Sequence, residues 1–406
     1  MEDRTDRRKP GRLAGNITRF RQDKRLAVTG VLHSLALLGM LACVVFGIFR
    51  YHENLRPENL SRLGAYLKAA GAVTDPFTRY EFESGLDTVC QPFGSGLAVT
   101  SGDTYSFVSG LGNSRYSIQL RYGDPAICTG DRYVLLYDRG GTGFCVANHY
   151  AEYLRDNTDS PILTATMNAR GDFALVTDQT GCRSAVTVYD DRQQLLCRWL
   201  TTQYYVMMTS VSPDGESFAA LCLGQEGLSL TTQVLYFEIG QEQPAWSLSL
   251  EERQVLALFH DKTGGLVILC ADGVLRCAAG NVTASRDFSR ELRMFSAREE
   301  EALLLAFDAG EQGSRGAELL LLGDGLEPLW SGSEQGTLRA VSCRAGTACL
   351  LTYDRLTTVR LREDGTATTE AAAVSGPRSV TVSPEGEPIL IYSDRAEKLA
   401  DEKEDA

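Results

Sequence analysis

The sequence is poor in histidine and lacks the short motifs of the common catalytic sites. Only four His occur among its 406 residues: His33, His52, His149 and His260. It contains no Gly-x-Ser-x-Gly elbow, no phosphate-binding loop and no His-Glu-x-x-His helix. Clustered carboxylates, as in "REEEALLL" at 298–305, are interpreted as exposed loop charge rather than as an acid–base pair. The sequence therefore predicts no catalytic residue, no cofactor and no cofactor-binding residue, and we expect a protein that is not an enzyme.

Cysteine is present, but its spacing does not indicate a metal site. None of the eleven Cys has Cys-x-x-Cys spacing, which argues against a zinc or thioredoxin-like site. Cys145 and His149 lie four residues apart, but two isolated ligands are too few to predict metal binding. Most Cys lie inside apolar stretches and are expected to be small buried thiols. Whether Cys343 and Cys349 form a disulfide is left undecided by the sequence: a three-residue loop at 345–347 would place the two residues opposite each other.

Apolar periodicity of helical length is absent after about residue 75. This absence excludes a doubly wound α/β fold, which needs long crossover helices. The chain has instead 39 Gly, mostly in turn-like settings, and many short β-branched runs. This pattern is typical of an all-β domain built from many short strands.

A strand–turn–strand pattern recurs along the chain. "VSPDGESFAALC" at 211–222 is echoed by "VSPEGEPILI" at 382–391 and, more loosely, by "MNARGDFALVT" at 167–177. Pro, an acidic residue and Gly in sequence favour a tight turn. The turn glycines are 44 and 171 residues apart, which fits one and four periods of about 43, the period of β-propeller blades. Trp199, Trp246 and Trp330 keep a similar phase, as do recurring Tyr-Asp pairs.

The repeats predict one β-propeller over residues 78–394, with eight blades or, alternatively, seven. Blades are expected to begin near Asp87, Asp124, Pro161, Tyr205, Gln254, Phe295, Leu338 and Arg378. The eighth has room for two strands, 378–384 and 388–393, so we expect "TRYEFES" at 78–84 to complete it from the N-terminal side. The charged segment 395–406 is expected to be a disordered tail.

The N-terminal part has a different character. Residues 1–25 carry nine Arg or Lys, and residues 26–49 follow without a formal charge. Twenty-four helical residues span roughly 36 Å, enough for a hydrocarbon core of about 30 Å. We expect a basic cytoplasmic tail at 1–25 and a transmembrane signal anchor at 26–49, with a cleaved signal peptide as the alternative. Residues 50–77 should hold a membrane-proximal helix at 56–71 and a linker, and His33 is expected to be tolerated without a function.

The order of these segments carries a resemblance. A basic tail, a single span, the "RPENLSRL" helix, "YEFES" and strands such as "VLLYDRGG" resemble an uncharacterised family of single-pass membrane-anchored, propeller-like proteins of Gram-positive bacteria. The resemblance covers nearly the whole chain and implies its architecture and cell-surface placement. It implies no catalytic residues. The chain departs from WD-type repeats in lacking regular Gly-His and Trp-Asp pairs.

The net charge of the part after the uncharged stretch limits which partners are expected. Residues 50–406 hold 31 Lys or Arg and 49 Asp or Glu, a formal net charge of −18, which disfavours nucleic acid. We expect a membrane-anchored, extracytoplasmic binding module for a protein or a cell-wall-associated ligand. Two alternatives stay open: a propeller-type carbohydrate hydrolase or lyase with acids in its channel, and a structural subunit of a membrane complex.

Overall fold

The computed structural model describes residues 24–51, 79–82, 88–94, 96–101, 103–108, 115–227, 229–251, 253–298, 301–309, 316–362 and 365–399. The chain divides into two compact units, residues 1–57 and residues 58–406. The first contains the helix α1 (Lys24–Tyr51), and the second contains every strand found among the described residues. Over the part of the chain that the structure describes, no helix is both long and apolar enough to cross a membrane. The expected helix at 56–71 lies outside the described residues.

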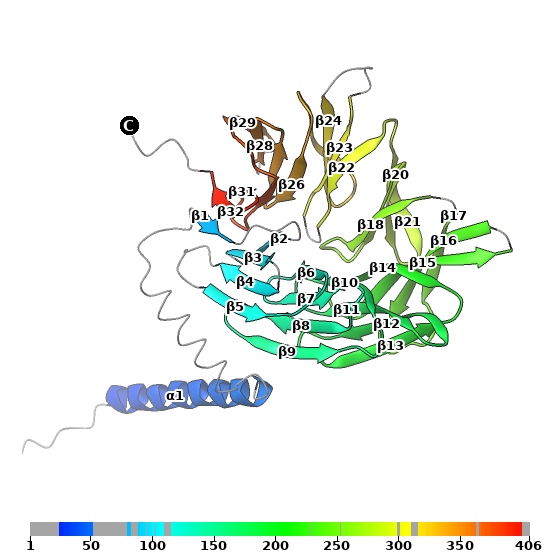
Figure 1. Cartoon of the computed structure of the whole chain (residues 1–406). Helices are drawn as coiled ribbons and strands as arrows, with labels where there is room; N and C mark the ends of the chain where they lie inside the picture. Colours follow the sequence, from blue (N-terminus) through cyan, green and yellow to red (C-terminus); the bar gives the residue numbers. More distant parts are fainter. Residues whose placement is uncertain are drawn as a thin grey trace, which may run out of the picture. The chain divides into compact units, whose positions relative to one another are not determined.

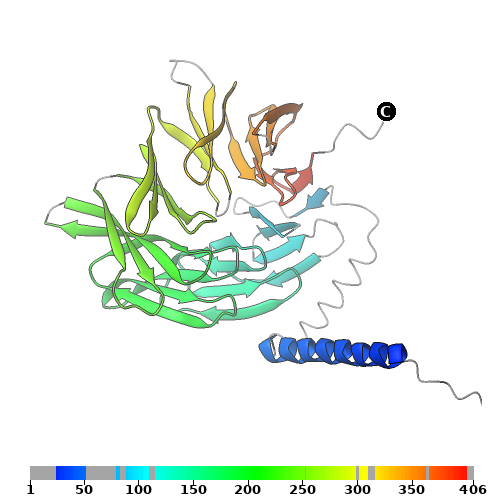
Figure 2. The same cartoon turned by 180° about the vertical axis from the view of Figure 1, so that it is seen from behind.

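The strands form eight four-stranded antiparallel sheets, which we number as blades in chain order (Figures 1 and 2). Blade 1 contains β2 (Val89–Phe93), β3 (Gly96–Ser101), β4 (Thr104–Val108) and β5 (Arg115–Gln119). Blade 2 contains β6 (Pro125–Thr129), β7 (Val134–Asp138), β8 (Gly143–Ala147) and β9 (Glu152–Asn157). Blade 3 contains β10 (Ile162–Met167), β11 (Phe173–Gln179), β12 (Cys182–Tyr189) and β13 (Leu195–Thr201). Blade 4 contains β14 (Tyr205–Val211), β15 (Ser217–Glu226), β16 (Ser229–Glu238) and β17 (Trp246–Glu251).

The second half of the ring repeats this arrangement. Blade 5 contains β18 (Val255–His260), β19 (Leu266–Cys270), β20 (Gly273–Ala278) and β21 (Asn281–Asp287). Blade 6 contains β22 (Leu292–Ser296), β23 (Leu303–Asp308), β24 (Ala317–Leu322) and β25 (Pro328–Glu334). Blade 7 contains β26 (Ala340–Arg344), β27 (Thr347–Leu351), β28 (Arg355–Leu361) and β29 (Ala367–Ala373). Blade 8 contains β30 (Ser379–Val382), β31 (Pro388–Ile391), β32 (Arg395–Lys398) and β1 (Arg79–Glu81).

The ring closes with strands from both ends of the domain. β1 pairs antiparallel with β32, placing Tyr80 opposite Ala396, and both side chains are buried (Figure 1). The first strand of blade 8, β30, also contacts the first strand of blade 1, β2. The eight-bladed propeller and its closure by the segment around residue 80 are therefore confirmed.

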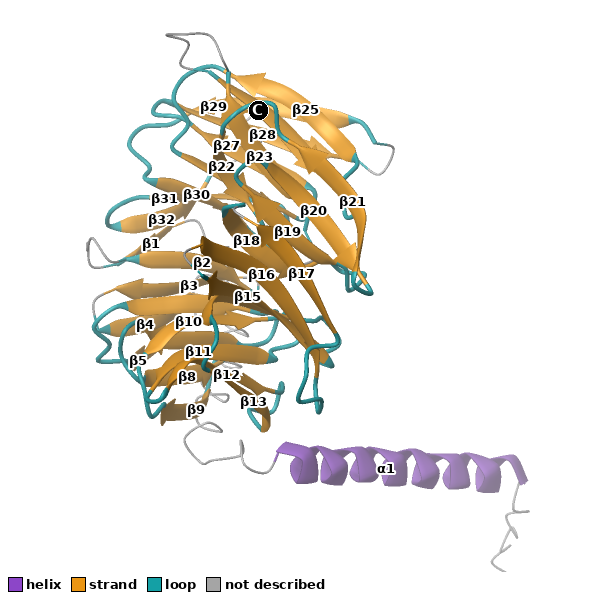
Figure 3. Ribbon diagram, turned by 90° about the vertical axis from the view of Figure 1, so that its right-hand side faces the viewer, coloured by secondary structure: helices purple, strands orange, loops and turns teal. Residues whose placement is uncertain are grey.

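A separate hydrophobic core fills each of the eight interfaces between neighbouring blades. In β7, Val134 and Leu136 pack toward blade 1, whereas Leu135 and Tyr137 pack toward blade 3. Successive strand residues point to opposite faces, so a blade between two others is buried on both. This explains why second strands read as continuous apolar runs, such as β19 (Leu266–Cys270), in which all five residues are buried. Figure 3 shows the strands of the propeller from the side.

The repeated turns join the first and second strands of their blades. Gly171, Gly215 and Gly386 occupy the same place and have φ values of 107°, 71° and 83°, which favour glycine. Gly264 in "DKTGG", with φ 81°, is a fourth example of this turn glycine that the repeat pattern in the sequence did not reveal. The three Trp lie on the outermost strands of blades 3, 4 and 6, so they share one place in the repeat. The Tyr-Asp pairs do not share one place: Tyr137 and Asp138 are the last two residues of a second strand, whereas Tyr189 ends a third strand.

One sequence prediction is corrected, and the undecided pairing of Cys343 with Cys349 is answered. Residues 395–398, expected to begin a disordered tail, form the strand β32, because β31 and β1 pair with its two edges and Ala396 is buried. The eighth blade therefore takes three strands from the C-terminal side rather than two. Cys343 is opposite Ala348, not Cys349, because the turn has two residues, Ala345 and Gly346, instead of three. Both thiols are free and pack in different cores, on opposite faces of blade 7.

Candidate functional site

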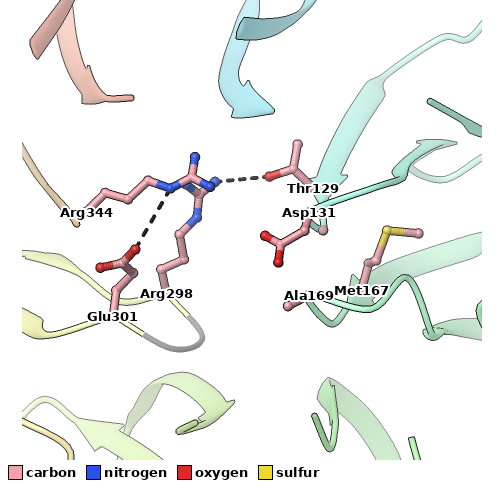
Figure 4. Close-up of a pocket in the computed structure, with 8 residues that line it drawn as sticks. Thr129, Asp131, Met167, Ala169, Arg298, Glu301 and Arg344 are labelled. Atoms are coloured by element: carbon pink, nitrogen blue, oxygen red, sulfur yellow. Dashed lines mark hydrogen bonds and ion pairs between the residues drawn. The ribbon is translucent and has the colours of Figure 1, made fainter. Parts of the chain in front are cut away.

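The candidate site lies at one mouth of the propeller channel, where the innermost strands end. The first strand of each blade is the innermost, because these strands contact one another around the ring. Thr129, Met167 and Arg344 are each the last residue of such a strand, in blades 2, 3 and 7. With Gly130, Asp131, Ala169, Arg298 and Glu301 they line a cavity of about 120 Å³ (Figure 4). The fold thus brings residues from four blades to one small cavity.

Arg298 joins opposite sides of the ring. It follows β22 of blade 6, and its Nη2 donates a hydrogen bond of 3.0 Å to Oγ1 of Thr129 in blade 2 (Figure 4). Blades 2 and 6 are four apart in a ring of eight, so this side chain crosses the channel. Oγ1 of Thr129 in turn donates to Oε1 of Gln91 in β2, at 3.4 Å. The Arg298 guanidinium is therefore held in place at the mouth.

Arg344 brings a second guanidinium to the same cavity. Its Nε lies 3.9 Å from Oε1 of Glu301, while Oε2 of Glu301 accepts a hydrogen bond of 2.8 Å from the backbone N–H of Ala345. Only 13% of the Arg344 side chain is exposed. Within the described residues, its Nη1 is buried and has no hydrogen-bond partner. A buried donor without a partner costs about 1–3 kcal/mol, so this nitrogen is a candidate ligand contact.

The electrostatics of the cavity follow from burial and from the closeness of its charges. Burial, followed by the positive charge of Arg344, lowers the pKa of Arg298 to about 10. Burial also lowers the pKa of Arg344 and raises the pKa of Glu301. The carboxylate of Asp131 partly offsets the effect on both arginines. Both guanidinium groups still carry their charge at neutral pH.

The rim beside the cavity is fixed by contacts between the turns of neighbouring blades. The N–H of Asp131 donates to the carbonyl oxygen of Ala169, at 2.8 Å. A Cβ at Gly130 would lie 2.5 Å from the carbonyl oxygen of Asn168, so only glycine allows this approach. Asn168 is fully buried, and its Nδ2 donates to the carbonyl oxygen of Ser212 in the next blade, at 2.7 Å. The turns of blades 2, 3 and 4 are therefore linked to one another beside the cavity.

The residues considered for a metal site lie elsewhere and do not form one. Cys145 is buried in the core between blades 1 and 2, and burial raises its pKa to about 12. His149 stacks on Phe93, with ring centroids 4.4 Å apart, and burial lowers its pKa to about 4. Among the residues that the structure describes, no group of three or more His, Cys, Asp or Glu is placed to bind a metal ion.

His260 lies in the interior, between blades 4 and 5. Its Nδ1 lies 2.8 Å from Oγ of Ser210, a spacing that would suit a nucleophile and its base. The imidazole is completely buried, however, and Ser210 is 1% exposed. Burial lowers the pKa of His260 to about 4. No substrate could reach this pair without opening the interface, so we assign it a packing role.

Sequence reasoning missed the residues that do converge. Arg298 precedes the acidic run and Glu301 ends it. The carboxylates of this run were interpreted as exposed loop charge, and that interpretation is wrong for Glu301, which is partly buried at the channel mouth. Thr129 and Arg298 are 169 residues apart, so no local pattern links them. The sequence signal that could have linked two of these residues was their position in the repeat. Thr129 and Arg344 are each the last residue of the first strand of a blade.

Comparison with solved structures shows the same fold at low sequence identity. The C-terminal WD40 domain of Sif2 is 10% identical, with a TM-score of 0.56, covering 81% of this chain and 99% of that one. The Dos1 propeller is 9% identical, with a TM-score of 0.53, covering 81% and 95%. BamB from Moraxella catarrhalis is 13% identical, with a TM-score of 0.48, covering 81% and 100%. The similarities to the Sif2 domain and to the Dos1 propeller concern the fold alone.

Sequence comparison adds a family that has no assigned activity. No curated protein matches the chain. Residues 75–245, which include blades 1 to 3 and most of blade 4, match the profile of a family described as a family of unknown function, DUF5711. The resemblance to an uncharacterised family is thus supported over this part of the chain.

Proposed function

We propose that this chain is a membrane-tethered, extracytoplasmic β-propeller that binds a protein or ligand at the channel mouth and catalyses no reaction. The observation that carries the proposal is the channel mouth, in which Arg298 and Arg344 converge with Asp131 and Glu301 on a cavity of about 120 Å³. Thr129 holds the Arg298 guanidinium and the backbone of Ala345 holds the Glu301 carboxylate, and such supported charged groups suit recognition. His149, which is partly buried, and His260, which is fully buried, do not line this cavity.

A carbohydrate hydrolase or lyase is the second candidate, because two carboxylates line the cavity. The raised pKa of Glu301, caused by burial, would suit a general acid, and Asp131 would be the second carboxylate. The size of the cavity argues against this activity. The cavity of about 120 Å³ is well below the roughly 300–1,000 Å³ of sites that enclose a complete small ligand, such as a hexose. We therefore favour binding over sugar hydrolysis.

The proposed tether is the uncharged stretch 26–49. Its support is the sequence, together with the surface of α1, where large apolar side chains are exposed around the helix: Leu32, Leu35, Leu37, Leu38, Met40, Leu41, Val44, Val45 and Phe46. Such a helix buries its side chains in lipid or against a partner. The basic residues before the stretch favour a cytoplasmic N-terminus and an external propeller. A helix that contacts other membrane proteins, as in a structural subunit, is compatible with the same anchoring.

The test of binding is photo-crosslinking in cells from two positions on opposite mouths of the ring. Arg132 is exposed beside Asp131, and Thr180 is exposed in the turn between β11 and β12. These turns lie at opposite ends of their blades, because successive strands are antiparallel. A photoreactive residue at 132 should give a discrete crosslinked product, and one at 180 should not. Products of equal yield from both positions would count against the mouth as the binding surface.

The test of topology is protease accessibility. Protease added to intact cells freed of their wall should remove residues 58–406 and spare an epitope at the N-terminus. A propeller that is protected until the membrane is permeabilised would contradict the external placement.

A further inference from the structure

The channel-mouth cavity has the hydrogen-bond donors of an anion site, and its size suits one chemical group of a larger ligand. It lies beside Nη1 of Arg344, which is buried without a partner among the described residues, and beside the Arg298 guanidinium, which Thr129 orients. Guanidinium groups present planar forks of N–H donors that match the two oxygens of a carboxylate. The arrangement therefore favours a planar anion over a neutral or cationic group.

The charges beside the cavity decide between anions. Two arginines are accompanied by the carboxylates of Glu301 and Asp131, so the cluster has no formal net charge. A phosphate carries close to two negative charges at neutral pH, about twice the excess negative charge that a carboxylate would bring to this cluster. A carboxylate carries one charge and needs fewer donors, so we favour it over phosphate.

The volume decides what carries the carboxylate. The cavity of about 120 Å³ is small and suits a single group such as a carboxylate with its adjacent carbon, which together have four non-hydrogen atoms. Binding sites for complete small ligands usually enclose about 300–1,000 Å³. A free ligand of four atoms would reach a Kd on the order of 10⁻⁵ M at best. The cavity thus suits one group of a larger molecule whose remainder lies on the rim.

We propose that Arg298 and Arg344 hold the carboxylate of an acidic side chain from a protein partner, which enters the mouth of the channel. This inference rests on the binding function proposed above and names its chemistry. Arg344 supplies Nη1, and Arg298, oriented by Thr129, supplies the second guanidinium. The surrounding rim, fixed by the contacts between Asp131 and Ala169, holds the partner's main chain outside.

The experiment measures weak binding to the full chain in detergent by saturation-transfer NMR, at constant ionic strength and pH 7. The probes are acetate, its neutral analogue acetamide, and N-acetyl-aspartate N-methylamide, which presents the same carboxylate on a peptide backbone. Acetate and the aspartate derivative should bind saturably, the derivative at least as tightly as acetate, and acetamide should not. Binding of acetate with exclusion of the derivative would overturn the proposal, since a free small acid would then be the ligand.

Variants locate the binding. Arg344→Gln should weaken acetate and the aspartate derivative at least tenfold. Arg344→Lys, which keeps the charge and loses the fork, should weaken them less. The matched control is Arg360→Gln on the same blade, where Arg360 pairs with the exposed Glu370 at 2.7 Å, outside the cavity. The control should bind like the unaltered chain, and thermal melts check that each variant is folded.

The inference would be overturned if no saturable binding were seen. It would also be overturned if the chain with Gln or Lys at position 344 bound the probes as tightly as the unaltered chain. The lysine variant keeps the test decisive if the glutamine variant does not fold. The crosslinking experiment at position 132 is independent of this outcome. A crosslinked product from position 132 together with no carboxylate binding would leave the proposed function standing and remove only the acidic anchor.

Discussion

His149 and His260 are neutral side chains built into the interfaces between blades. His149 packs between Phe93 and Phe107, with ring centroids 4.4 and 4.6 Å away, and His260 contacts Ser210. Burial lowers the pKa of each imidazole to about 4, from an ordinary value near 6.5. Between these values the unfolded chain binds more protons than the folded chain. The stability that these groups contribute is therefore present above pH 6.5 and is lost as the pH falls toward 4.

We predict that replacing His260 with Gln flattens this acid dependence. At pH 4.5 the protonation of one such histidine in the unfolded state costs roughly 2–3 kcal/mol of folding stability. Urea unfolding at pH 7 and pH 4.5 should show a smaller loss for His260→Gln than for the unaltered chain. His33→Gln, in α1, serves as the control and should leave the difference unchanged. Identical pH differences for all three chains would show that His260 is not buried as a neutral group.

Gly215 supports the contact between blades 3 and 4 as well as its own turn. Its φ is +71°, and a Cβ there would lie 2.5 Å from Oδ2 of Asp172, a buried side chain. Gly181 has a similar φ of +82° with nothing within 4 Å of its Cβ position. Both Gly→Ala changes carry a left-handed backbone cost of about 1–2 kcal/mol. Gly215→Ala must in addition displace a buried carboxyl group.

We therefore predict that Gly215→Ala lowers the free energy of unfolding by at least about 1 kcal/mol more than Gly181→Ala does. Denaturant unfolding of the two variants measures the difference directly. If they were equally stable, the turns of neighbouring blades would not be in the close contact that frames the channel mouth.

The strand β1 shows how three residues can complete a ring of eight blades. Tyr80 is 8% exposed and lies in the core between blades 8 and 1, while Arg79 and Glu81 point outward. Without β1, the edge of β32 and part of this core would face solvent, and exposed sheet edges favour aggregation.

We predict that a shortened chain beginning at residue 84 is less stable than one beginning at residue 75. Loss of the buried Tyr80 side chain alone should cost about 3 kcal/mol or more. Thermal unfolding of the two shortened chains should give a lower midpoint for the one beginning at 84. Equal midpoints would mean that β1 contributes nothing to closing the ring.

Local sequence patterns identified the strands well where turn chemistry is strong. Expected blade starts such as Asp124, Tyr205 and Arg378 lie within one residue of β6, β14 and β30. They failed where a single residue changes the register, as in the two-residue turn at Ala345 and Gly346 that separates Cys343 from Cys349. They also failed at β32, whose charged residues form a strand only because two neighbouring strands pair with it.

In the complete ring, closure places residues from blades 2, 3, 6 and 7 around one cavity. No segment of the sequence contains that cavity, since Thr129, Arg298 and Arg344 meet only after the blades have been arranged in a circle. Period and phase predicted the circle, and the number of blades fixes which ends of the inner strands face one another. The identity of the site therefore depended on the structure, whereas the fold did not.

The central claim is that a partner binds at the mouth formed by Arg298 and Arg344. The most direct measurement is the yield of in-cell photo-crosslinking from position 132 in three otherwise identical chains: unaltered, Arg344→Gln and Arg360→Gln. We predict that the crosslinked product is lost when Arg344 is replaced and is retained when Arg360 is replaced. Equal yields from all three chains would contradict the claim.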